Sequence, residues 1–371
     1  MKLMTIFGTR PEAVKLAPIL AKLDRETDIQ SLVCVTGQHR EMLAEINRFF
    51  DVRPGIDLRA MKVGQTLNPL TGRLLDRLDR ALAETRPDRV IVQGDTTTAL
   101  AGAQAAYNRQ IPVAHVEAGL RTYTANPWPE EGNRQAIARY CDLHFAPTAA
   151  AAANLAVERV RGRIFVTGNS GIDALGAVLM RGGAHIAFPA GKLVLVTVHR
   201  RESFGAPLAD ICHALADLAS RERITLLWPV HPNPNVRGPV QTMLGGRRSI
   251  RLVDPMPLPT FVRAMQRADL ILTDSGGVQE EGAALGKPLV VLREETERPE
   301  GVAAGVARLV GTDRGRILAA ATHLLDHPPE HRALDIYGDG RAAGRIVDGL
   351  LGRPVETFVP QAERDGLRRM G

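Results

Sequence analysis

The feature of this 371-residue chain that most constrains its fold is the alternation of short apolar runs with longer amphipathic stretches. The runs are rich in Val, Ile and Leu and are continuous, without a polar residue at every second position. Such strands are typical of a parallel sheet that helices cover on both faces. The predicted strands are 3–7, 31–35, 89–92, 113–116, 143–146, 164–166, 193–198, 225–229, 250–252, 270–273, 289–292 and 307–310. Helical patterns lie between them, for example at 40–50, 97–108 and 208–220. The chain is therefore predicted to be an α/β protein.

The pattern starts again near residue 190, after a segment at 180–191 whose Gly, Ala and Pro content is typical of a linker. This predicts two Rossmann-like, doubly wound domains, residues 1–180 and 190–352, with an interdomain cleft and a polar C-terminal tail at 353–371. Ligands of such sheets bind beyond the carboxyl ends of the strands. Functional residues are therefore expected directly after strands.

The composition argues against binding to nucleic acid or a membrane. The formal net charge is +6, but basic residues are interleaved with acids, and aromatic residues make up only 4% of the chain, too few to stack on many bases. This balance also suits a small anionic substrate. No stretch approaches the roughly 18 apolar residues of a membrane span, and three cysteines without a CxxC motif indicate a reducing compartment. The protein is expected to be cytoplasmic.

Three predicted turns carry residues that suit phosphate groups. In the first, Gly8 ends a strand and Pro11 opens a helix, and Arg10 and Lys15 flank the N-terminus of that helix, a natural anion site. The third turn, which begins with His199 and two arginines, follows the strand 193–198. A solvated first turn and a surface salt-bridge cluster are the respective alternatives.

The second turn follows the strand 270–273 and gives the strongest signal. Gly276 and Gly277 at a helix start allow backbone N–H groups to approach a diphosphate closely, and Ser275 adds a hydroxyl. Glu281 lies one turn into the helix, where its carboxylate could accept hydrogen bonds from two ribose hydroxyls. The alternative is an ordinary helix N-cap. The chain has no G-x-G-x-x-G motif and no cluster with metal-ligand spacing, so neither a cofactor nor a metal is predicted.

Several carboxylates follow strands of the first domain. Asp95 comes after the strand 89–92 and Glu117 after the strand 113–116, whereas Glu130 and Glu131 begin a helix. Acids at this sheet edge, near phosphate sites, are functional more often than surface acids are. The alternatives are an N-cap for Asp95 and a favourable position at the helix dipole for the glutamate pair.

A diphosphate clamp together with several acids suits either sugar transfer to an acceptor or chemistry on the sugar itself. The C2 proton of a hexosamine is not acidic, but expulsion of the diphosphate from C1 makes it so. A base on one face of C2, an acid on the other and a cationic clamp for the leaving diphosphate would then invert C2. The residues described above supply this set.

Taken together, the motifs resemble the UDP-N-acetylglucosamine 2-epimerase family, which has the GT-B-type two-domain fold. The matching stretches run from about residue 2 to residue 351 and are FGTRPEAVKLAP, QHREML, GDTTTAL, PVAHVEAGLRT, PWPEEGNR, HRRESFG, WPVHPNPNVR, LTDSGGVQEEG, GKPLVVLREETERPEG and LVGTD. The resemblance implies that the acid/base residues are Asp95, Glu117 and Glu130. It implies that the UDP-sugar is bound by Arg10, Lys15, His199, Phe261, Ser275, Gly276, Gly277, Glu281 and Arg298.

The family has a non-hydrolysing bacterial branch, which returns UDP-ManNAc, and a hydrolysing branch, which releases free ManNAc and UDP. The first branch binds a second UDP-GlcNAc as an activator, and the residues that resemble that site are Gln38, His39, Glu131, Arg201 and His231. The resemblance therefore favours the non-hydrolysing reaction, through a 2-acetamidoglucal, for the supply of surface polysaccharide precursors. It also implies a homodimer.

Four alternatives stay open at this point. They are the hydrolysing epimerase, a related branch that epimerises UDP-sugars bearing a 2,3-diacetamido uronic acid, a GT-B glycosyltransferase and a nucleotide-sugar sensor without catalysis. One position departs from the family pattern, because Met256 stands where many members carry a Gln near the uracil.

Overall fold

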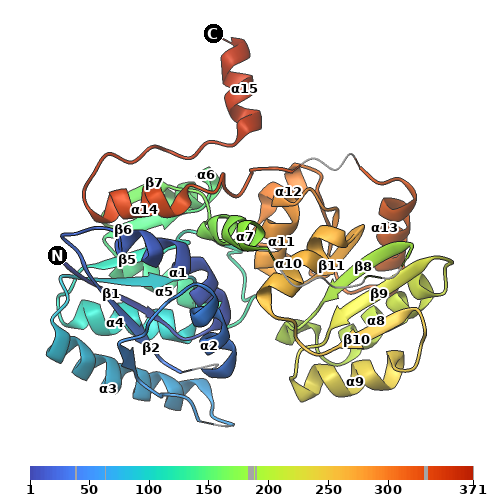
Figure 1. The fold of residues 1–371 in the computed structure, drawn as a ribbon, viewed down its shortest axis with the longest axis horizontal. Coiled ribbons are helices and arrows are strands. Elements are labelled where there is room, and N and C mark those ends of the chain that lie inside the picture. The colour runs from blue at the N-terminus through green and yellow to red at the C-terminus, as the bar shows by residue number, and fades with distance from the viewer. Residues whose placement is uncertain (38–39, 63, 183–187, 189, 330–332, 371) are drawn as a thin grey trace. The chain divides into compact units, whose positions relative to one another are not determined.

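The computed structural model describes residues 1–37, 40–62, 64–182, 188, 190–329 and 333–370. The chain forms two compact units (Figure 1). The first consists of Met1–Ala174 together with Tyr337–Gly371, and the second consists of Leu175–Ile336. Each unit has one parallel sheet with helices around it, which confirms the predicted fold class.

The first unit has a seven-stranded sheet in the order β3-β2-β1-β4-β5-β6-β7. Its strands are β1 (Lys2–Phe7), β2 (Gln30–Val35), β3 (Ile56–Asp57), β4 (Arg89–Gln93), β5 (Val113–Val116), β6 (Leu143–Ala146) and β7 (Arg163–Val166). Its helices are α1 (Arg10–Leu23), α2 (Arg40–Phe49), α3 (Leu67–Thr85), α4 (Thr97–Asn108), α5 (Glu130–Tyr140), α6 (Ala149–Val157), the first turn of α7 (Ser170–Arg181), α14 (Ala342–Leu350) and α15 (Gln361–Met370). The strand order reverses between β1 and β4, which marks the edge where ligands of such sheets bind.

The second unit has a six-stranded parallel sheet in the order β10-β9-β8-β11-β12-β13. Its strands are β8 (Lys192–Thr197), β9 (Ile224–Pro229), β10 (Ile250–Val253), β11 (Leu270–Thr273), β12 (Leu289–Val291) and β13 (Ala307–Leu309). Its helices are α8 (Ala206–Ala219), α9 (Pro234–Leu244), α10 (Leu258–Arg267), α11 (Gly276–Ala284), α12 (Pro299–Ala303) and α13 (Arg314–Asp326), with a short 3₁₀ helix, η1 (Arg201–Ser203). Here the order reverses between β8 and β11.

Continuous apolar strands are buried on both faces in each unit. Met4 of β1 and Val92 of β4 pack with Leu74 and Leu78 of α3, and all four side chains are fully buried. Burial of each such side chain contributes about 1.5–3 kcal/mol to the free energy of unfolding. Every predicted strand coincides with an observed strand to within one residue at either end. The strand β3 was not predicted, because two residues form no apolar run.

The C-terminal segment returns to the first unit. Residues 337–352, which the sequence assigned to the second domain, lie in the first unit, as does the predicted tail at 353–371. The carboxylate of Asp173 in α7 accepts hydrogen bonds from the backbone N–H groups of Ala342 (3.2 Å) and Ala343 (2.9 Å) at the start of α14. Phe358 is buried, and its backbone N–H donates to the carbonyl of Val166 in β7. The domain boundary predicted at residue 352 is therefore wrong for this segment, because the apolar pattern of a helix does not specify which of two sheets it covers.

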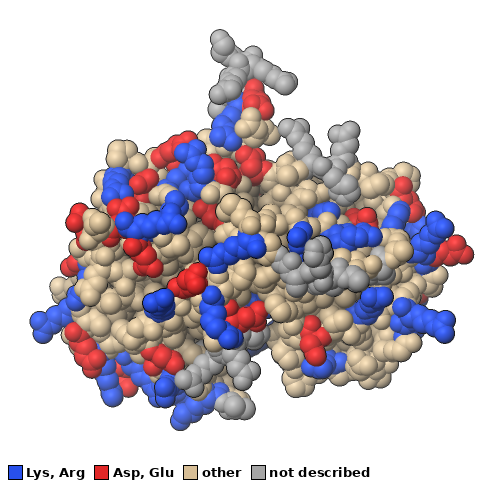
Figure 2. Space-filling view, in the orientation of Figure 1, with Lys and Arg blue, Asp and Glu red and all other residues tan. Residues whose placement is uncertain are grey.

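The charge distribution agrees with the composition. Figure 2 shows basic and acidic side chains interspersed over the visible face of both units, without a continuous basic stripe on that face. Among the described residues, no helix combines the length and apolar character that crossing a lipid bilayer requires.

Candidate functional site

Glu117 lies at the carboxyl edge of the first sheet, where several side chains hold its carboxylate. It directly follows β5 with φ +64°, a backbone conformation that is rare for a residue with a side chain. Lys15 of α1 donates to its Oε1 at 2.5 Å, Asn169 donates to the same oxygen at 3.2 Å, and Gln93 at the end of β4 donates to Oε2. Glu117 is only 9% exposed, so an ammonium and two amides stabilise its negative charge in a largely dry environment.

Asp95 lies at the same edge, in the turn between β4 and α4. Arg134 donates to its Oδ2 at 2.7 Å, and the Asp95 side chain is 27% exposed, so part of the carboxylate remains accessible. The alternative reading of Asp95 as an N-cap does not hold, because Thr96 is the N-cap of α4 and accepts from the N–H of Ala99 at 3.1 Å. Two carboxylates with separate basic partners therefore follow the neighbouring strands β4 and β5.

A buried histidine supports the turn that carries Asp95. Nε2 of His115, in β5, lies 2.7 Å from the carbonyl oxygen of Gly94, which has φ +70°. Burial lowers the pKa of His115 to about 3, so its ring is neutral near pH 7 and donates this hydrogen bond. This hydrogen bond holds the backbone of Gly94, one residue before Asp95.

Glu12 connects this turn to the first predicted phosphate turn. Its buried carboxylate accepts from the N–H groups of Gly8 (3.1 Å) and Thr9 (2.7 Å), which completes a capping box at the start of α1. It also accepts from the hydroxyl of Thr96 at 2.7 Å. Burial raises the pKa of Glu12, against the opposing effect of these hydrogen bonds. Arg10, the first residue of α1, is half-buried beside this network.

Glu130 and Glu131 open α5 but have different surroundings. Glu130 is half-buried. Glu131 is buried, and its carboxylate accepts from the backbone N–H groups of Thr122 (3.0 Å) and Tyr123 (3.2 Å) and from the side chain of Gln135 (2.8 Å). Glu131 therefore holds the loop between β5 and α5 in place.

In the second unit, Asp274 joins two of the predicted phosphate turns. Its side chain is fully buried, and its Oδ2 accepts from the backbone N–H groups of His199 (2.9 Å) and Arg200 (2.8 Å). This is possible because β8 and β11 are neighbours in the sheet, with Thr197 paired to Thr273. The turn after β8 and the turn after β11 thus meet where the strand order reverses.

The two glycines at the start of α11 have different roles. A Cβ atom on Gly276 would lie 2.4 Å from Nη1 of Arg298, whereas a Cβ on Gly277 would meet nothing within 4 Å. The guanidinium of Arg298 is held by Glu280 (2.7 Å) and Glu297 (2.5 Å), and all three side chains are buried. Arg298 therefore packs against the N-terminus of α11, and the space beside Gly277 is open.

The remaining predicted residues of the second unit are more accessible. His199 is exposed, and its ring stacks on that of His231 with centroids 5.9 Å apart. Arg201 is exposed in η1. The half-buried residues are Ser275 at the N-cap of α11, Glu281 within α11, Phe261 in α10 and Met256 just before α10. Gln38 and His39 lie outside the described residues.

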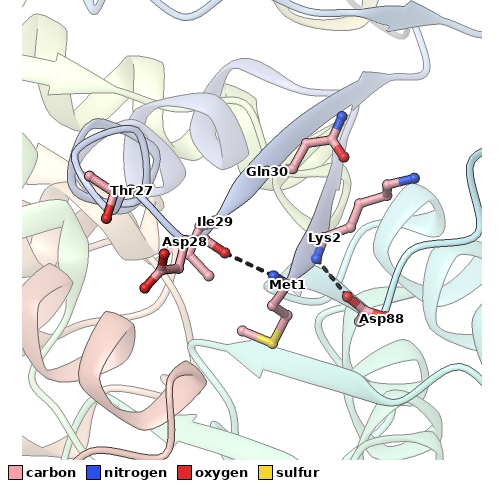
Figure 3. Close-up of a pocket in the computed structure, with 7 residues that line it drawn as sticks. All are labelled: Met1, Lys2, Thr27, Asp28, Ile29, Gln30 and Asp88. Atoms are coloured by element: carbon pink, nitrogen blue, oxygen red, sulfur yellow. Dashed lines mark hydrogen bonds between the residues drawn. The ribbon is translucent and has the colours of Figure 1, made fainter.

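A shallow pocket at the amino ends of β1, β2 and β4 lies away from these groups (Figure 3). There the N-terminal amine donates to the carbonyl of Asp28 at 2.8 Å, and the N–H of Lys2 donates to Asp88 at 2.7 Å. Ligands of doubly wound sheets bind at the opposite, carboxyl edge. This pocket is therefore not assigned to the functional site.

Several site residues were not singled out from the sequence. Gln93 and Asn169 donate to Glu117, Arg134 pairs with Asp95, and Asp274 holds the turn of His199. Gln93, Asn169 and Asp274 all stand at or just after the end of a strand, a signal that could have identified them. Arg134 lies within a helix, where no local signal separates it from a surface arginine.

Comparison with known proteins gives one consistent result. A family model described as UDP-N-acetylglucosamine 2-epimerase matches residues 21–351. The chain is 48% identical over 369 residues to a UDP-N-acetylglucosamine 2-epimerase of Escherichia coli K12, covering 94% of this chain and 98% of that protein. The crystal structure of UDP-GlcNAc 2-epimerase from Neisseria meningitidis bound to UDP-GlcNAc is similar with a TM-score of 0.92 and 41% identity, over 95% of this chain and 100% of that one. The enzyme from Methanocaldococcus jannaschii in complex with UDP-GlcNAc and UDP is similar with a TM-score of 0.88 and 32% identity, over 95% and 100% of the two chains.

Proposed function

The chain belongs to the UDP-N-acetylglucosamine 2-epimerase family, and from this premise we propose that it converts UDP-N-acetylglucosamine reversibly into UDP-N-acetylmannosamine. The observation that supports the proposal best is the pair of carboxylates after β4 and β5, each beside a basic partner. Glu117 has Lys15 at 2.5 Å, and Asp95 has Arg134 at 2.7 Å. Inversion at C2 requires a base on one face of the sugar and an acid on the other.

The reaction proposed is elimination of UDP followed by its re-addition. The C1–O bond breaks and its electron pair leaves with UDP, while a base takes the C2 proton. The C2–H electron pair becomes the C1=C2 bond of 2-acetamidoglucal. Protonation of C2 from the opposite face and re-addition of UDP to C1 give the epimer. Neither step consumes water, an oxidant or a reductant.

We assign the acid/base chemistry to Asp95, Glu117 and Glu130 in the first unit. The three donors around Glu117 stabilise the form of its carboxylate that accepts a proton. The partial exposure of Asp95 leaves an oxygen available to a substrate. The resemblance implies that Lys15 contacts UDP, but in this structure Lys15 forms an ion pair with Glu117. We therefore propose that Lys15 also acts on the reaction by stabilising the negative charge of the Glu117 carboxylate.

The second unit is proposed to hold UDP. Gly276, Gly277 and Ser275 present the N-terminus of α11, where backbone N–H groups and the helix dipole favour the diphosphate. Glu281 lies one turn further, in reach of the ribose hydroxyls in this proposal. Binding also involves Arg10 from the first unit and His199, Phe261 and Arg298 from the second. Stabilisation of the leaving diphosphate by these groups lowers the barrier to elimination.

A second UDP-N-acetylglucosamine is proposed to act as an activator near Gln38, His39, Glu131, Arg201 and His231. The Glu131 carboxylate accepts hydrogen bonds from the backbone of the loop between β5 and α5. Its proposed contribution to the activator site is therefore to hold that loop in place. We further propose that the enzyme works as a homodimer and supplies precursors for surface polysaccharides.

The decisive experiment is incubation with UDP-N-acetylglucosamine in deuterated water. The proposal requires deuterium at C2 of both epimers and the accumulation of UDP-N-acetylmannosamine. Persistent release of free N-acetylmannosamine with UDP would assign the hydrolysing reaction instead. Binding without C2 exchange would contradict an epimerase of either kind.

A further inference from the structure

Asp274 has a second carboxylate oxygen that the backbone of the turn does not use. Its Oδ2 accepts the two N–H groups of His199 and Arg200 and lies 3.4 Å from the hydroxyl of Ser203. Its Oδ1 is buried and accepts no hydrogen bond from the described residues. A buried carboxylate oxygen without a donor is unfavourable unless a charged or polar partner faces it.

The group that faces this oxygen is the imidazole of His199. Nδ1 of His199 lies 3.3 Å from Oδ1 of Asp274, so a small adjustment of the ring gives a hydrogen bond. The His199 side chain is 41% exposed, whereas Asp274 is fully buried. The Asp274 carboxylate is therefore buried beneath the His199 ring. The exposed part of the ring is accessible at the edge where the turns after β8 and β11 meet.

We propose that Asp274 is a positioning residue that holds His199 as an imidazolium directed at the diphosphate of the UDP-sugar. In this dyad Nδ1–H donates to Oδ1 of Asp274, and Nε2–H donates to a phosphate oxygen. The inference rests on the proposed function, because that function places UDP beside His199. It extends that function by assigning a role to a buried acid that touches no substrate.

The physical basis of the proposal is that both Asp274 and the diphosphate favour a His199 ring with protons on both nitrogens. A neutral imidazole that donates through Nδ1 has only a lone pair at Nε2, and a lone pair does not bind an anion. A buried negative charge next to Nδ1 favours the doubly protonated ring, which can donate at both nitrogens. A charge-assisted hydrogen bond to phosphate is roughly twice as strong as a neutral one.

Among the described residues, Asp274 is the acid that pairs with the imidazole of His199. The ring of His231 stacks on His199 and would oppose a positive charge if it were itself protonated. Arg200, on the same turn, lies 3.8 Å from Glu297, and Glu202 pairs with Arg293 at 2.9 Å. Those two glutamates are therefore engaged with arginines, while Asp274 Oδ1 faces the imidazole.

The proposal is tested by measuring the affinity for UDP by calorimetry between pH 6 and pH 9. As the pH rises from 6 to 9, the UDP affinity of the wild-type protein should fall about tenfold more than that of His199→Gln. Comparison of the two proteins removes the effect of the titration of UDP itself, because that effect is the same in both. Asp274→Asn should show the shallow pH dependence of His199→Gln. Its amide oxygen can still accept the two backbone N–H groups, and its NH₂ would favour a neutral ring. Ser203→Ala is the matched control, because Ser203 touches Oδ2 only, and it should keep the wild-type dependence.

A second measurement observes the protonation of His199 directly in the wild-type protein. Nitrogen-15 spectra of histidine-labelled wild-type protein with UDP at pH 7 should show both ring nitrogens of His199 protonated, and His199→Gln identifies the signals. An unprotonated Nε2 in the complex, or a wild-type pH dependence in folded Asp274→Asn, would overturn the dyad. Absence of UDP binding in the wild type at every pH would instead contradict the proposed function, and the dyad with it.

Discussion

At the scale of single residues, the site depends on carboxylates whose environments differ. Glu117 is nearly buried and has three donors, Asp95 is partly exposed and has one arginine, and Glu131 serves the backbone of a loop. The surroundings of each carboxylate therefore determine which role it can have. The positions of these acids after strands and at a helix start were predicted from the sequence, whereas the partners of each carboxylate are given by the tertiary structure.

The role proposed for Asp95 leads to a direct prediction. Replacement by Asn keeps the size of the side chain but removes its ability to take a proton. We expect Asp95→Asn to lower the rate of C2–deuterium exchange by at least about a hundredfold, the lower range for a general acid or base. UDP affinity, measured by calorimetry, should change less than threefold.

Arg134 gives the matched control for this result. Arg134→Lys keeps a positive charge near Asp95 but not the same geometry, so a smaller loss of exchange rate is expected. If Asp95→Asn weakened UDP binding as much as it slowed exchange, a catalytic role for Asp95 would be contradicted.

At the scale of elements, the N-terminus of α11 depends on two adjacent glycines with opposite surroundings. A methyl group on Gly276 would collide with the guanidinium of Arg298, which is buried and pinned between Glu280 and Glu297. A methyl group on Gly277 meets open space. Glycine at 276 is therefore required for packing against Arg298, whereas glycine at 277 is proposed to leave room for the ligand.

The corresponding variants should behave differently in two assays. Gly276→Ala should lower the free energy of unfolding by roughly 1–3 kcal/mol, as overpacking does. Gly277→Ala should leave stability unchanged or raise it slightly, because Ala is a better helix former. It should nevertheless weaken UDP binding, since the added methyl group occupies space that the diphosphate needs. Denaturation and calorimetry measure the two effects, and unchanged UDP affinity in Gly277→Ala would contradict the placement of UDP at α11.

At the scale of the whole molecule, the two units follow one another along the chain except at the C-terminus. There the segment from Tyr337 onward rejoins the first unit, held by Asp173 at the start of α14 and by Arg345, whose guanidinium donates to the carbonyl of Thr167 at 3.2 Å. The backbone N–H of Asn169 also donates to the carbonyl of Tyr337 at 2.7 Å. Because Asn169 donates to Glu117, the returning segment indirectly supports the carboxylate that we propose for acid/base chemistry.

The anchor at Asp173 predicts a pH-dependent contribution to stability. Burial raises the pKa of Asp173 to about 6, above its value in an unfolded chain. A raised folded-state pKa contributes stability that is fully present below about pH 4 and is lost as the pH rises through 6. The difference in unfolding free energy between wild type and Asp173→Asn should therefore shift against the wild type by roughly 2–3 kcal/mol from pH 4 to pH 7.

Chemical denaturation of both proteins at pH 4, 5, 6 and 7 checks this expectation. Glu26→Gln is a useful comparison, because the pKa of Glu26 is lowered by its hydrogen bonds to Arg353, so its contribution has the opposite pH dependence. A constant difference between wild type and Asp173→Asn across this range would rule out the linkage.

The sequence by itself determined the strands, the two parallel sheets and the positions of the turns whose residues we propose to bind phosphate. It could do so because a strand buried on both faces must be continuously apolar, and because phosphate-binding turns and acids stand directly after strands in such sheets. Only the tertiary structure decided which partners those residues have. Lys15 pairs with Glu117, Asp274 holds His199, and the segment after residue 337 covers the first unit. These contacts join residues 75 to more than 160 positions apart, and local patterns carry no information about which of many compatible partners folding brings together.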